Sequence, residues 1–533
     1  MNNKKIIPIF VALVLIAGTL SLTGCLEDDE DDETDTLTIA IAMEPSDFHP
    51  VRYTAGAETG QFLAQVFDPL LASWYEGEPT VEERTIASDF EMLDDGQRYR
   101  FHIKEDIKFH NGDSLTADDV AFSIDTMMMG EDRTDEYKDK WDVDQNQISP
   151  RQGDWESADY VEVVDDYTVD LYMEEFNAEF LVTSGFENMR IIPLNYIQEN
   201  GWDKFDEELI GTGPYEFVEY QRGDMMEFKK FEDSNVEVNI DRIVVDFYDE
   251  LPAAITALRA GEVDFVSRLE PSQYKDLENE PGVVRDAYDL GGSFYIAFNH
   301  KEGPTTDVRV RKAIAYAIDV QTIIDAIRVP ELAVDSRALV DPSHPAAADD
   351  LNTYEQDLEK AQELLDEAGY EDGLELSMYA WEGSQDPMVL FQDQLGDIGL
   401  EIDITTLEWG GFTDAMGAAE PDLMYTGWPG AASADYMMGW MIQDHSYVDW
   451  ALYYDSPEYT DLVNDAKSEP DFEDRMELYK QAQRVNVNDE MGLFNLWWES
   501  EPFAYRDNLE IPENTIVAYN DGPITHVHQW SFE

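Results

Sequence analysis

The chain has 533 residues, of which 43% are hydrophobic and 12% aromatic, enough apolar surface for a large folded core. Its 117 acidic and 34 basic residues give a formal net charge of −83, which argues against nucleic acid as a partner. Acidic residues outnumber basic ones in nearly every segment. This pattern favours a surface adapted to concentrated salt, where the Debye length shrinks to about 3 Å at 1 M. An acidic protein of ordinary salinity is the alternative.

Residues 1–25 have the pattern of a lipoprotein signal. Lys4 and Lys5 precede an apolar run over 6–22, and a small-residue site ends at Cys25, the only cysteine of the chain. The run is short and interrupted compared with a membrane span of about 20 apolar residues. We therefore expect a signal peptide over 1–24 and a lipid on Cys25 that anchors the protein at the cell surface, on the outer face of the cytoplasmic membrane. An uncleaved anchor helix with an incidental thiol is the alternative.

The segment after Cys25 is strongly acidic. Residues 27–35 read EDDEDDETD, and because like charges repel, we expect 25–35 to be an extended tether that carries the lipidated cysteine. Disulfides cannot staple the mature chain, since no cysteine follows Cys25. A large hydrophobic core must therefore hold the fold in an oxidising compartment.

Strands and helices alternate in the first half of the chain. Alternating apolar and polar residues predict a first strand over 36–42. A helix is expected over 114–129, where Ser114 or Thr116 can cap the start and acidic residues occupy the first turn. Hairpins are expected where two alternating segments flank a turn, at 98–109, 161–173 and 215–231.

The second half reads as a series of α/β units. A strand at 243–248, a helix at 252–259 closed by Gly261 and a strand at 263–265 predict a βαβ unit. Further strands are expected at 293–298, 374–380, 400–407 and 492–498, and helices at 307–327, 357–368, 387–397 and 478–485. The pattern predicts a mixed α/β fold.

Five segments carry a specific pattern: 101–123 (FHIKEDIKFHNGDSLTADDVAFS), 211–215 (GTGPY), 254–264 (AITALRAGEVD), 308–319 (VRVRKAIAYAID) and 357–373 (DLEKAQELLDEAGYEDG). In this order they resemble the large peptide/nickel-binding family, family 5, of the extracytoplasmic solute-binding proteins of ABC importers. The resemblance extends over nearly the whole mature chain. One such segment is weak evidence, but their shared order is a specific signal.

The resemblance implies an α/β, two-lobed periplasmic-binding-protein-like (type II) fold with an extra α+β subdomain and a ligand cleft between the lobes. The implied parts are a base lobe over 36–85, 206–290 and 491–533, an extra subdomain over 86–205, and a second lobe over 291–490. Two crossings near Leu290 and Met491 then form a hinge, and closure around solute is a hinge motion.

The resemblance also places candidate ligand residues in the second lobe. The family's peptide-binding branch has a tryptophan after a strand, which Trp409 matches, and an acidic residue soon after Gly-Trp that pairs with the ligand's amino terminus. Trp428 and Asp435 fit that pattern, although the loop between them is longer than the family's. A desolvated carboxylate makes a charge-assisted bond to an ammonium group that is about twice as strong as a neutral one. The alternatives to a role in binding are that Asp435 is an ordinary surface acid and that Trp409 and Trp428 are core residues.

The strand that contains Phe294, Tyr295 and Asn299 lines the cleft in the resembling proteins and can bond to an extended peptide through its backbone. Because side chains alternate along a strand, only half of them can face a ligand. Tyr53 and Thr54, which follow the first strand, are the candidates from the base lobe.

Enzymatic and metal sites are not indicated. No nucleophile motif, HExxH zinc site, phosphate loop or cysteine pair is visible, so we expect no catalysis, no cofactor and no metal site. Asp142, Asp144 and Asn146 begin like a calcium loop, but the glycine and the final glutamate of such a loop are missing. His526 and His528 have no further ligands nearby in the sequence, and we expect them at the surface.

The sequence thus predicts a monomeric, lipid-anchored, substrate-binding lipoprotein that captures a dipeptide or oligopeptide between its lobes. Its expected partners are the peptide, the membrane, and the permease and ATPase subunits of an ABC transporter. An oligosaccharide or a nickel chelate remains an alternative ligand, because the matching segments are shared by all branches of the family. A secreted hydrolase that uses paired carboxylates is the alternative from another class.

Overall fold

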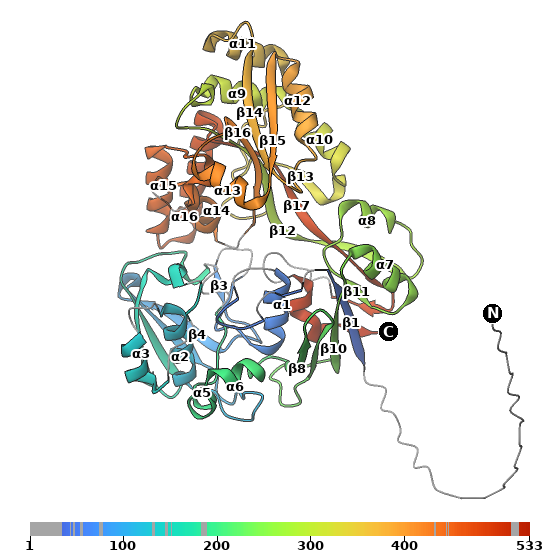
Figure 1. Ribbon diagram of the computed structural model, residues 1–533. Coiled ribbons are helices and arrows are strands. Elements are labelled where there is room, and N and C mark those ends of the chain that lie inside the picture. The colour runs from blue at the N-terminus through green and yellow to red at the C-terminus, as the bar shows by residue number, and fades with distance from the viewer. Residues whose placement is uncertain are drawn as a thin grey trace, which may run out of the picture. The chain divides into compact units, whose positions relative to one another are not determined.

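The fold is built around an eleven-stranded sheet, shown by a computed structural model (Figure 1). The structure describes residues 35–533 except 43, 46–47, 54–56, 74–77, 130–133, 144–147, 151, 183–188, 431–432, 444, 446 and 513–521. The predicted signal peptide, Cys25 and most of the predicted tether lie outside the described residues. Over the described ranges, no helix is both long and apolar enough to cross a bilayer.

The base lobe contains one end of this sheet. β1 (Thr36–Ile41) lies between β10 (Arg242–Phe247) and β11 (Phe265–Val266), and all three are parallel. The helix α7 (Leu251–Ala260) connects β10 to β11 and ends at Gly261, whose positive φ of 72° suits glycine. The predicted βαβ unit is confirmed. The hairpin predicted at 215–231 is also confirmed, as β8 (Tyr215–Gln221) and β9 (Met225–Lys230).

The second lobe contains the other end of the sheet. Its parallel strands are β14 (Leu374–Trp381), β15 (Leu400–Leu407) and β16 (Leu423–Trp428). The helices that cover this lobe include α11 (Leu358–Ala368), α12 (Met388–Gly396), α13 (Trp409–Gly417), α15 (Pro457–Lys467) and α16 (Phe472–Arg484). The predicted α/β series is confirmed.

One predicted helix of the second lobe is wrong. The segment 307–327 forms two helices, α9 (Val308–Ala317) and α10 (Val320–Ile327). Ile318 is extended, and the Asp319 side chain accepts a hydrogen bond from the backbone N–H of Thr322 and so caps the second helix. Aspartate is more favourable at the start of a helix than in its interior, which explains the break at Asp319. The apolar spacing of the sequence continues across this break and therefore predicted a single helix.

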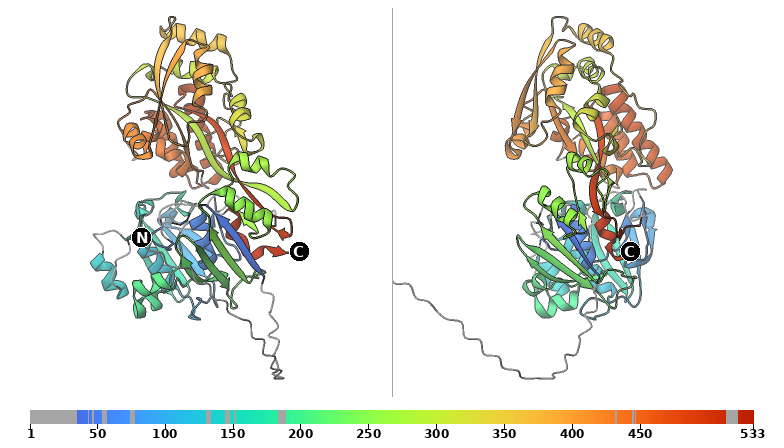
Figure 2. Two further views of the ribbon diagram at one scale, coloured as in Figure 1. Left: turned by 45° about the vertical axis from the view of Figure 1, so that its right-hand side comes forward. Right: turned by 90° about the vertical axis from the view of Figure 1, so that its right-hand side faces the viewer.

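Two long strands join the lobes. β12 (Val283–Phe298) and β17 (Leu493–Arg506) are antiparallel neighbours, and they run from the base lobe into the second lobe (Figures 1 and 2). Their register shifts between Tyr288, which is opposite Glu501, and Gly292, which is opposite Glu499. The three intervening residues of β12 thus face a single residue of β17, and such irregularities bend a strand pair. The predicted hinge near Leu290 lies at this irregularity.

The extra subdomain is a second sheet covered by a helix. Its strand order is β4 (Ala87–Leu93), β5 (Arg98–Ile103), β7 (Thr168–Met173) and β6 (Ala158–Asp165). The hairpin of β6 and β7 is confirmed, but the hairpin predicted over 98–109 is wrong, because β5 pairs with β4 and β7. The tight turn lies before β5, where Asp95 and Gly96 have positive φ. This turn signal was missed.

The helix of the extra subdomain, α2 (Ala117–Met128), confirms the prediction over 114–129. Its N-cap is Thr116, which forms a capping box with Asp119. Asp119 also accepts a hydrogen bond from the backbone N–H of Leu194, and burial raises its pKa to about 6. The cap therefore also fixes a neighbouring segment of the same subdomain.

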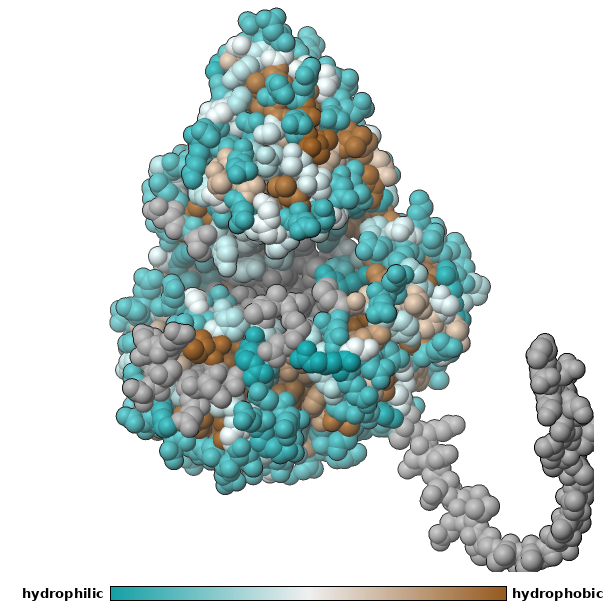
Figure 3. Space-filling view, in the orientation of Figure 1, coloured by the Kyte–Doolittle hydropathy of each residue, from teal (hydrophilic) through white to brown (hydrophobic). Residues whose placement is uncertain are grey.

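The buried apolar residues form separate cores. One core joins the base lobe to the extra subdomain, and another contains the second lobe, with members from Tyr295 to Trp498. Residues 493–498 include members of the second core, although the predicted boundary at 491 assigns them to the base lobe. The visible surface is mostly hydrophilic (Figure 3), as the composition requires.

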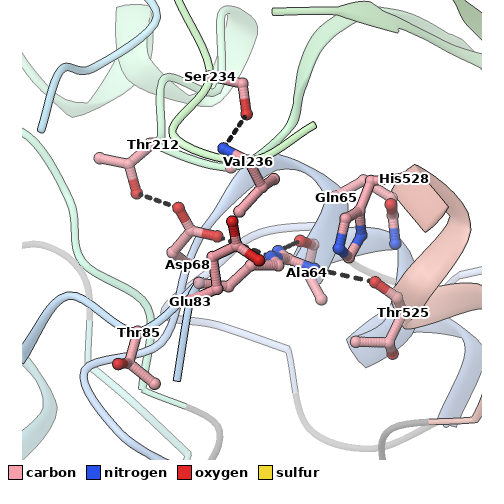
Figure 4. A network of polar contacts seen from close by, with 12 residues as sticks. Ala64, Gln65, Asp68, Glu83, Thr85, Thr212, Ser234, Val236, Thr525 and His528 are labelled. Atoms are coloured by element: carbon pink, nitrogen blue, oxygen red, sulfur yellow. Dashed lines mark hydrogen bonds and ion pairs between the residues drawn. The ribbon is translucent and has the colours of Figure 1, made fainter. Parts of the chain in front are cut away.

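A polar network fixes the C-terminal turn in the base lobe (Figure 4). Arg84 forms an ion pair with Asp68 at 2.9 Å and donates to the carbonyl of Thr525, also at 2.9 Å. His528 lies in the same region and is 4% exposed, so its predicted surface position is wrong. Burial and the nearby Arg84 lower the pKa of His528 to about 2. The network attaches the end of the chain to α1 (Ala57–Val66).

Candidate ligand-binding cleft

A cavity of about 850 Å³ lies where strands of both lobes end. Its lining includes Ala42 directly after β1, Ser267 directly after β11, and the last residues of β14 and β16, Trp381 and Trp428. In α/β proteins, ligands bind beyond the carboxyl ends of parallel strands, because loops with variable side chains meet there. The two sets of parallel strands therefore bring one binding region together from distant parts of the sequence.

One wall of the cavity is aromatic. Phe294, Trp381, Trp409 and Trp428 line it, and Trp409 is 53% exposed. The rings of Trp381 and Trp409 meet edge to face at 5.9 Å, and both Trp409 and Trp428 contact Trp450 behind the wall. A contiguous apolar patch with polar residues at its rim is typical of a ligand-binding groove. Trp381 was missed by the sequence reasoning, although it directly follows the strand predicted at 374–380.

The floor of the cavity carries two ion pairs on β17. Glu499 accepts a hydrogen bond from Arg328, which follows α10 in the second lobe, and Glu501 pairs with Arg268 of the base lobe at 3.1 Å. Arg268 has a φ of 54°, a strained value for a residue with a Cβ. Glu270 also lines the cavity. These charged residues were missed by the sequence reasoning, which had no signal to separate them from other acids.

The predicted strand residues lie in different environments. Phe294 lines the cavity, whereas its neighbour Tyr295 is buried in the core of the second lobe, as the alternation along a strand requires. The Asn299 side chain donates to the carbonyls of Ala419 and Pro421, at 2.8 and 3.0 Å. In the base lobe Tyr53 is buried in the core, and Thr54 lies outside the described residues. The structure thus brings Phe294 together with Trp409 and Trp428.

Asp435 lies in α14 (Ala434–Met438), next to a buried charge cluster rather than in the lining of this cavity. Its carboxylate forms an ion pair with Lys467 at 3.0 Å. The adjacent Ser433 donates to Glu179, a residue of the extra subdomain, at 3.0 Å. The role of Asp435 as the partner of a ligand amine stays a prediction, and it requires a ligand that competes with Lys467.

Glu179 is the centre of that cluster. It pairs with Arg475 at 2.9 Å, and the side chains are 1% and 5% exposed. Burial raises the pKa of Glu179 to about 6, against the opposite effect of Arg475. The backbone N–H of Ala178 also donates to the carbonyl of Lys467 at 2.8 Å. The cluster therefore joins the extra subdomain to the second lobe.

Metal binding gains no support from the geometry. In the part of the chain that the structure describes, no group of three or more histidine, cysteine, aspartate or glutamate residues is placed to hold a metal ion. The predicted loop residues Asp144 and Asn146 lie outside the described residues.

The comparison with known families decides the class of this protein. Residues 80–448 match the family described as bacterial extracellular solute-binding proteins, family 5 middle. The chain belongs to this family. Proteins of family 5 are binding proteins for solutes outside the cell, which supports the expectation of a non-enzyme.

Individual relatives of this family 5 protein differ in their ligands. Di/tripeptide-binding protein 1 of Pseudomonas aeruginosa is 26% identical over 469 residues, which are 83% of this chain and 85% of that protein. Heme-binding protein A of Haemophilus influenzae is 25% identical over 511 residues, which are 89% and 91% of the two chains. The solved structure of HbpA2 from Haemophilus parasuis, 21% identical, superposes with a TM-score of 0.81 and covers 93% of this chain and 100% of that one. The last comparison supports the predicted two-lobed fold.

Proposed function

We propose that this family 5 solute-binding protein captures a dipeptide or short oligopeptide in the cleft and delivers it to an ABC importer. The observation that carries the proposal is the cavity of about 850 Å³, which combines an aromatic wall with charges of both signs. The name of the Pseudomonas aeruginosa relative supports a di- or tripeptide ligand. Its partners are then a membrane permease and the associated ATPase subunits.

The chemistry of the cavity suits a short peptide. Ligand pockets are typically about 300–1,000 Å³ and combine apolar walls with a few polar groups that fix orientation. A free peptide has an ammonium group, a carboxylate and side chains of variable polarity. Acidic and basic residues on β17 and its neighbours can meet the two termini, and the tryptophans can cover side chains without selecting one of them.

The binding proposal is tested by calorimetric titration with dialanine, trialanine and tetra-alanine. Saturable binding of at least one peptide is expected, together with a change in tryptophan fluorescence, because Trp409 and Trp428 line the cavity. Maltotriose, a nickel–histidine complex and heme are the competing ligands. Binding of one of these alone would overturn the peptide proposal.

The anchoring proposal is that Cys25 carries lipid and that 25–35 is a tether outside the membrane. Cys25→Ser is expected to release the protein from the membrane fraction or to leave unprocessed precursor, because no other residue of the chain can form the thioether. Unchanged membrane fractionation of the variant would instead support an uncleaved anchor helix.

We further propose that the net charge of −83 adapts the protein to concentrated salt. Repulsion between surface carboxylates is screened at short Debye lengths, so removal of molar salt is expected to lower the melting temperature. A melting temperature that does not change between 0.1 and 2 M salt would contradict this adaptation.

A further inference from the structure

The carboxylate of Glu499 is held in place at the cavity by two hydrogen bonds. It lies on β17 at the shift in register between the lobe-joining strands, and it lines the cavity. The guanidinium of Arg328 and the indole N–H of Trp497 both donate to the same oxygen, Oε1, the latter at 2.8 Å. Two donors on one oxygen fix the position of the carboxylate group.

The other oxygen of Glu499 is unused. No described residue donates a hydrogen bond to Oε2, and the side chain is 25% exposed, so solvent or a ligand can reach the carboxylate. An ionised carboxylate has about four lone-pair sites. Glu499 therefore has accepting capacity for a ligand, and its orientation is set before the ligand arrives.

The charge of the surroundings favours a cation at this oxygen. Two arginines and three glutamates line the cavity, which leaves one excess negative charge among these groups. The guanidinium of Arg328 lies 5.5 Å from the ring centre of Phe294 and 5.6 Å from that of Trp497. It is thus held on two aromatic faces. The exposed Trp409 offers a further aromatic face, and aromatic faces attract ammonium groups.

Asp435 differs from Glu499 in its position. It does not line this cavity, and its carboxylate is paired with Lys467 at 3.0 Å. An ammonium group at Asp435 must compete with a cation that the protein already supplies. Glu499 also has a cation, Arg328, but that arginine bonds to Oε1, and Glu499 lies in the lining of the cavity with Oε2 left for a ligand.

We propose that Glu499 Oε2 accepts the free amino group of the ligand and that the cleft selects compounds with a primary ammonium group. Arg328 and Trp497 are positioning residues, which hold the carboxylate through its other oxygen. This inference rests on the proposed function, since it names the group that recognises the peptide. An N-acetylated peptide cannot make the charge-assisted bond and is therefore bound more weakly than the free peptide by the wild-type protein.

The test compares trialanine with N-acetyl-trialanine by calorimetry on the wild-type protein and on Glu499→Gln. The variant is expected to bind trialanine roughly ten- to a hundredfold more weakly, the range for a hydrogen bond to a charged group. Its affinity for the acetylated peptide should stay within about threefold of the wild type. The two ligands and two proteins form a double-mutant cycle that isolates the contact between amine and carboxylate.

Two further variants serve as controls. Asp435→Asn tests the competing carboxylate and is expected to change both affinities equally. Glu501→Gln is the matched control on β17, because Glu501 lines the same cavity and pairs with Arg268 instead. This substitution too is expected to change the affinities for the two peptides by the same factor, so that the preference for trialanine is kept. A coupling near zero in Glu499→Gln, or a coupling that appears in Asp435→Asn, overturns the inference.

A folding defect must be separated from a binding defect. If Glu499→Gln has a lowered melting temperature, Glu499→Asp replaces it, because the shorter side chain keeps the charge and withdraws the carboxylate by one methylene. Selective weakening of trialanine binding is again expected, and equal effects on both peptides contradict the inference. If the wild type binds no peptide at all, the proposed function itself fails, whereas peptide binding without coupling at Glu499 overturns only this inference.

Discussion

Two glutamate–arginine pairs of this protein differ in how many of the carboxylate oxygens accept a hydrogen bond. In the pair of Glu179 with Arg475, one carboxylate oxygen accepts from the arginine at 2.9 Å and the other from Ser433 at 3.0 Å, and both side chains are buried. In the pair of Glu499 with Arg328, only one oxygen is bonded and both side chains are partly exposed. The first pair is complete as a structural contact, whereas the second has capacity for a ligand.

The position of each pair in the fold agrees with this difference. Glu179 belongs to the extra subdomain and meets residues of the second lobe, so the buried pair fastens two parts of the chain. Glu499 lies on a strand that joins the lobes, beside the cavity. A charge that is buried with all of its partners is costly to disturb, while a half-bonded charge near solvent can exchange water for a ligand group.

The largest expected effect follows from the buried pair. Arg475→Ala leaves Glu179 in the interior without its cation, and loss of one partner of a buried pair costs about 3–5 kcal/mol of unfolding free energy. Urea denaturation measures the loss. Arg484→Ala is the control on the same helix, because its ion pairs with Asp350 and Glu477 are exposed and are expected to contribute below about 1 kcal/mol.

A double variant distinguishes an unpaired charge from lost packing. Glu179→Leu combined with Arg475→Met removes both charges, and it is expected to recover most of the stability that Arg475→Ala loses. Equal stability of the single and double variants would show that the ion pair is not what holds this region.

The second prediction concerns pH. Burial raises the pKa of Glu179 from 4.5 to about 6, so between these values the folded protein binds more protons than the unfolded chain. The contribution of this group to stability therefore rises as pH falls from about 6 to 4.5, by about 2 kcal/mol, and is lost as pH rises through the same window. The measurement is the unfolding free energy of wild type minus that of Glu179→Gln at pH 7 and pH 4.5. A difference that does not change with pH contradicts the raised pKa.

A smaller effect is expected at the aromatic wall. Trp409 is 53% exposed, so Trp409→Ala should change the unfolding free energy by less than about 1 kcal/mol but weaken trialanine binding roughly tenfold, about 1.4 kcal/mol. Calorimetry measures the affinity. Val389→Ala is the control, because Val389 is 67% exposed and lies outside the cavity lining. If wild type and Trp409→Ala bind trialanine with equal affinity, the aromatic wall does not contribute to ligand binding.

The smallest effect is expected at Asp435. Its pair with Lys467 is partly exposed, with side chains that are 14% and 25% accessible. Asp435→Asn is therefore expected to cost less unfolding free energy than Arg475→Ala, because the Asp435 and Lys467 side chains keep some contact with solvent. Lys467→Gln is the matched variant and should show a similar loss. A loss as large as that of Arg475→Ala would mean that Asp435 belongs to the buried fastening contact.

Helix ends and the alternation along strands could be predicted from the sequence, because they depend on residues that are close together in the chain. The glycine at the end of α7 and the capping box of α2 need only neighbouring residues. The alternation that places Phe294 in the cavity and Tyr295 in the core is likewise a property of one strand. The break at Asp319 was missed because the apolar periodicity hid an N-cap.

The charged part of the site could not be predicted, because its contacts are remote in sequence. Arg328 and Glu499 are 171 residues apart, and Arg475 and Glu179 are 296 residues apart. In a chain with 117 acidic residues, composition cannot indicate which carboxylate meets a cation. The context around Asp435 matched the resembling family, but Lys467 comes from another helix and its pairing is visible only in the fold.

Hydrogen exchange tests the central claim most directly, because it reports both regions in one experiment. With saturating trialanine, we expect increased protection of backbone amides at 426–428 and 499–501, which line the cavity, and no change at 178–180 and 433–438 around the buried pair. Protection concentrated at 433–438, with none at 499–501, would contradict the account and place the ligand at Asp435.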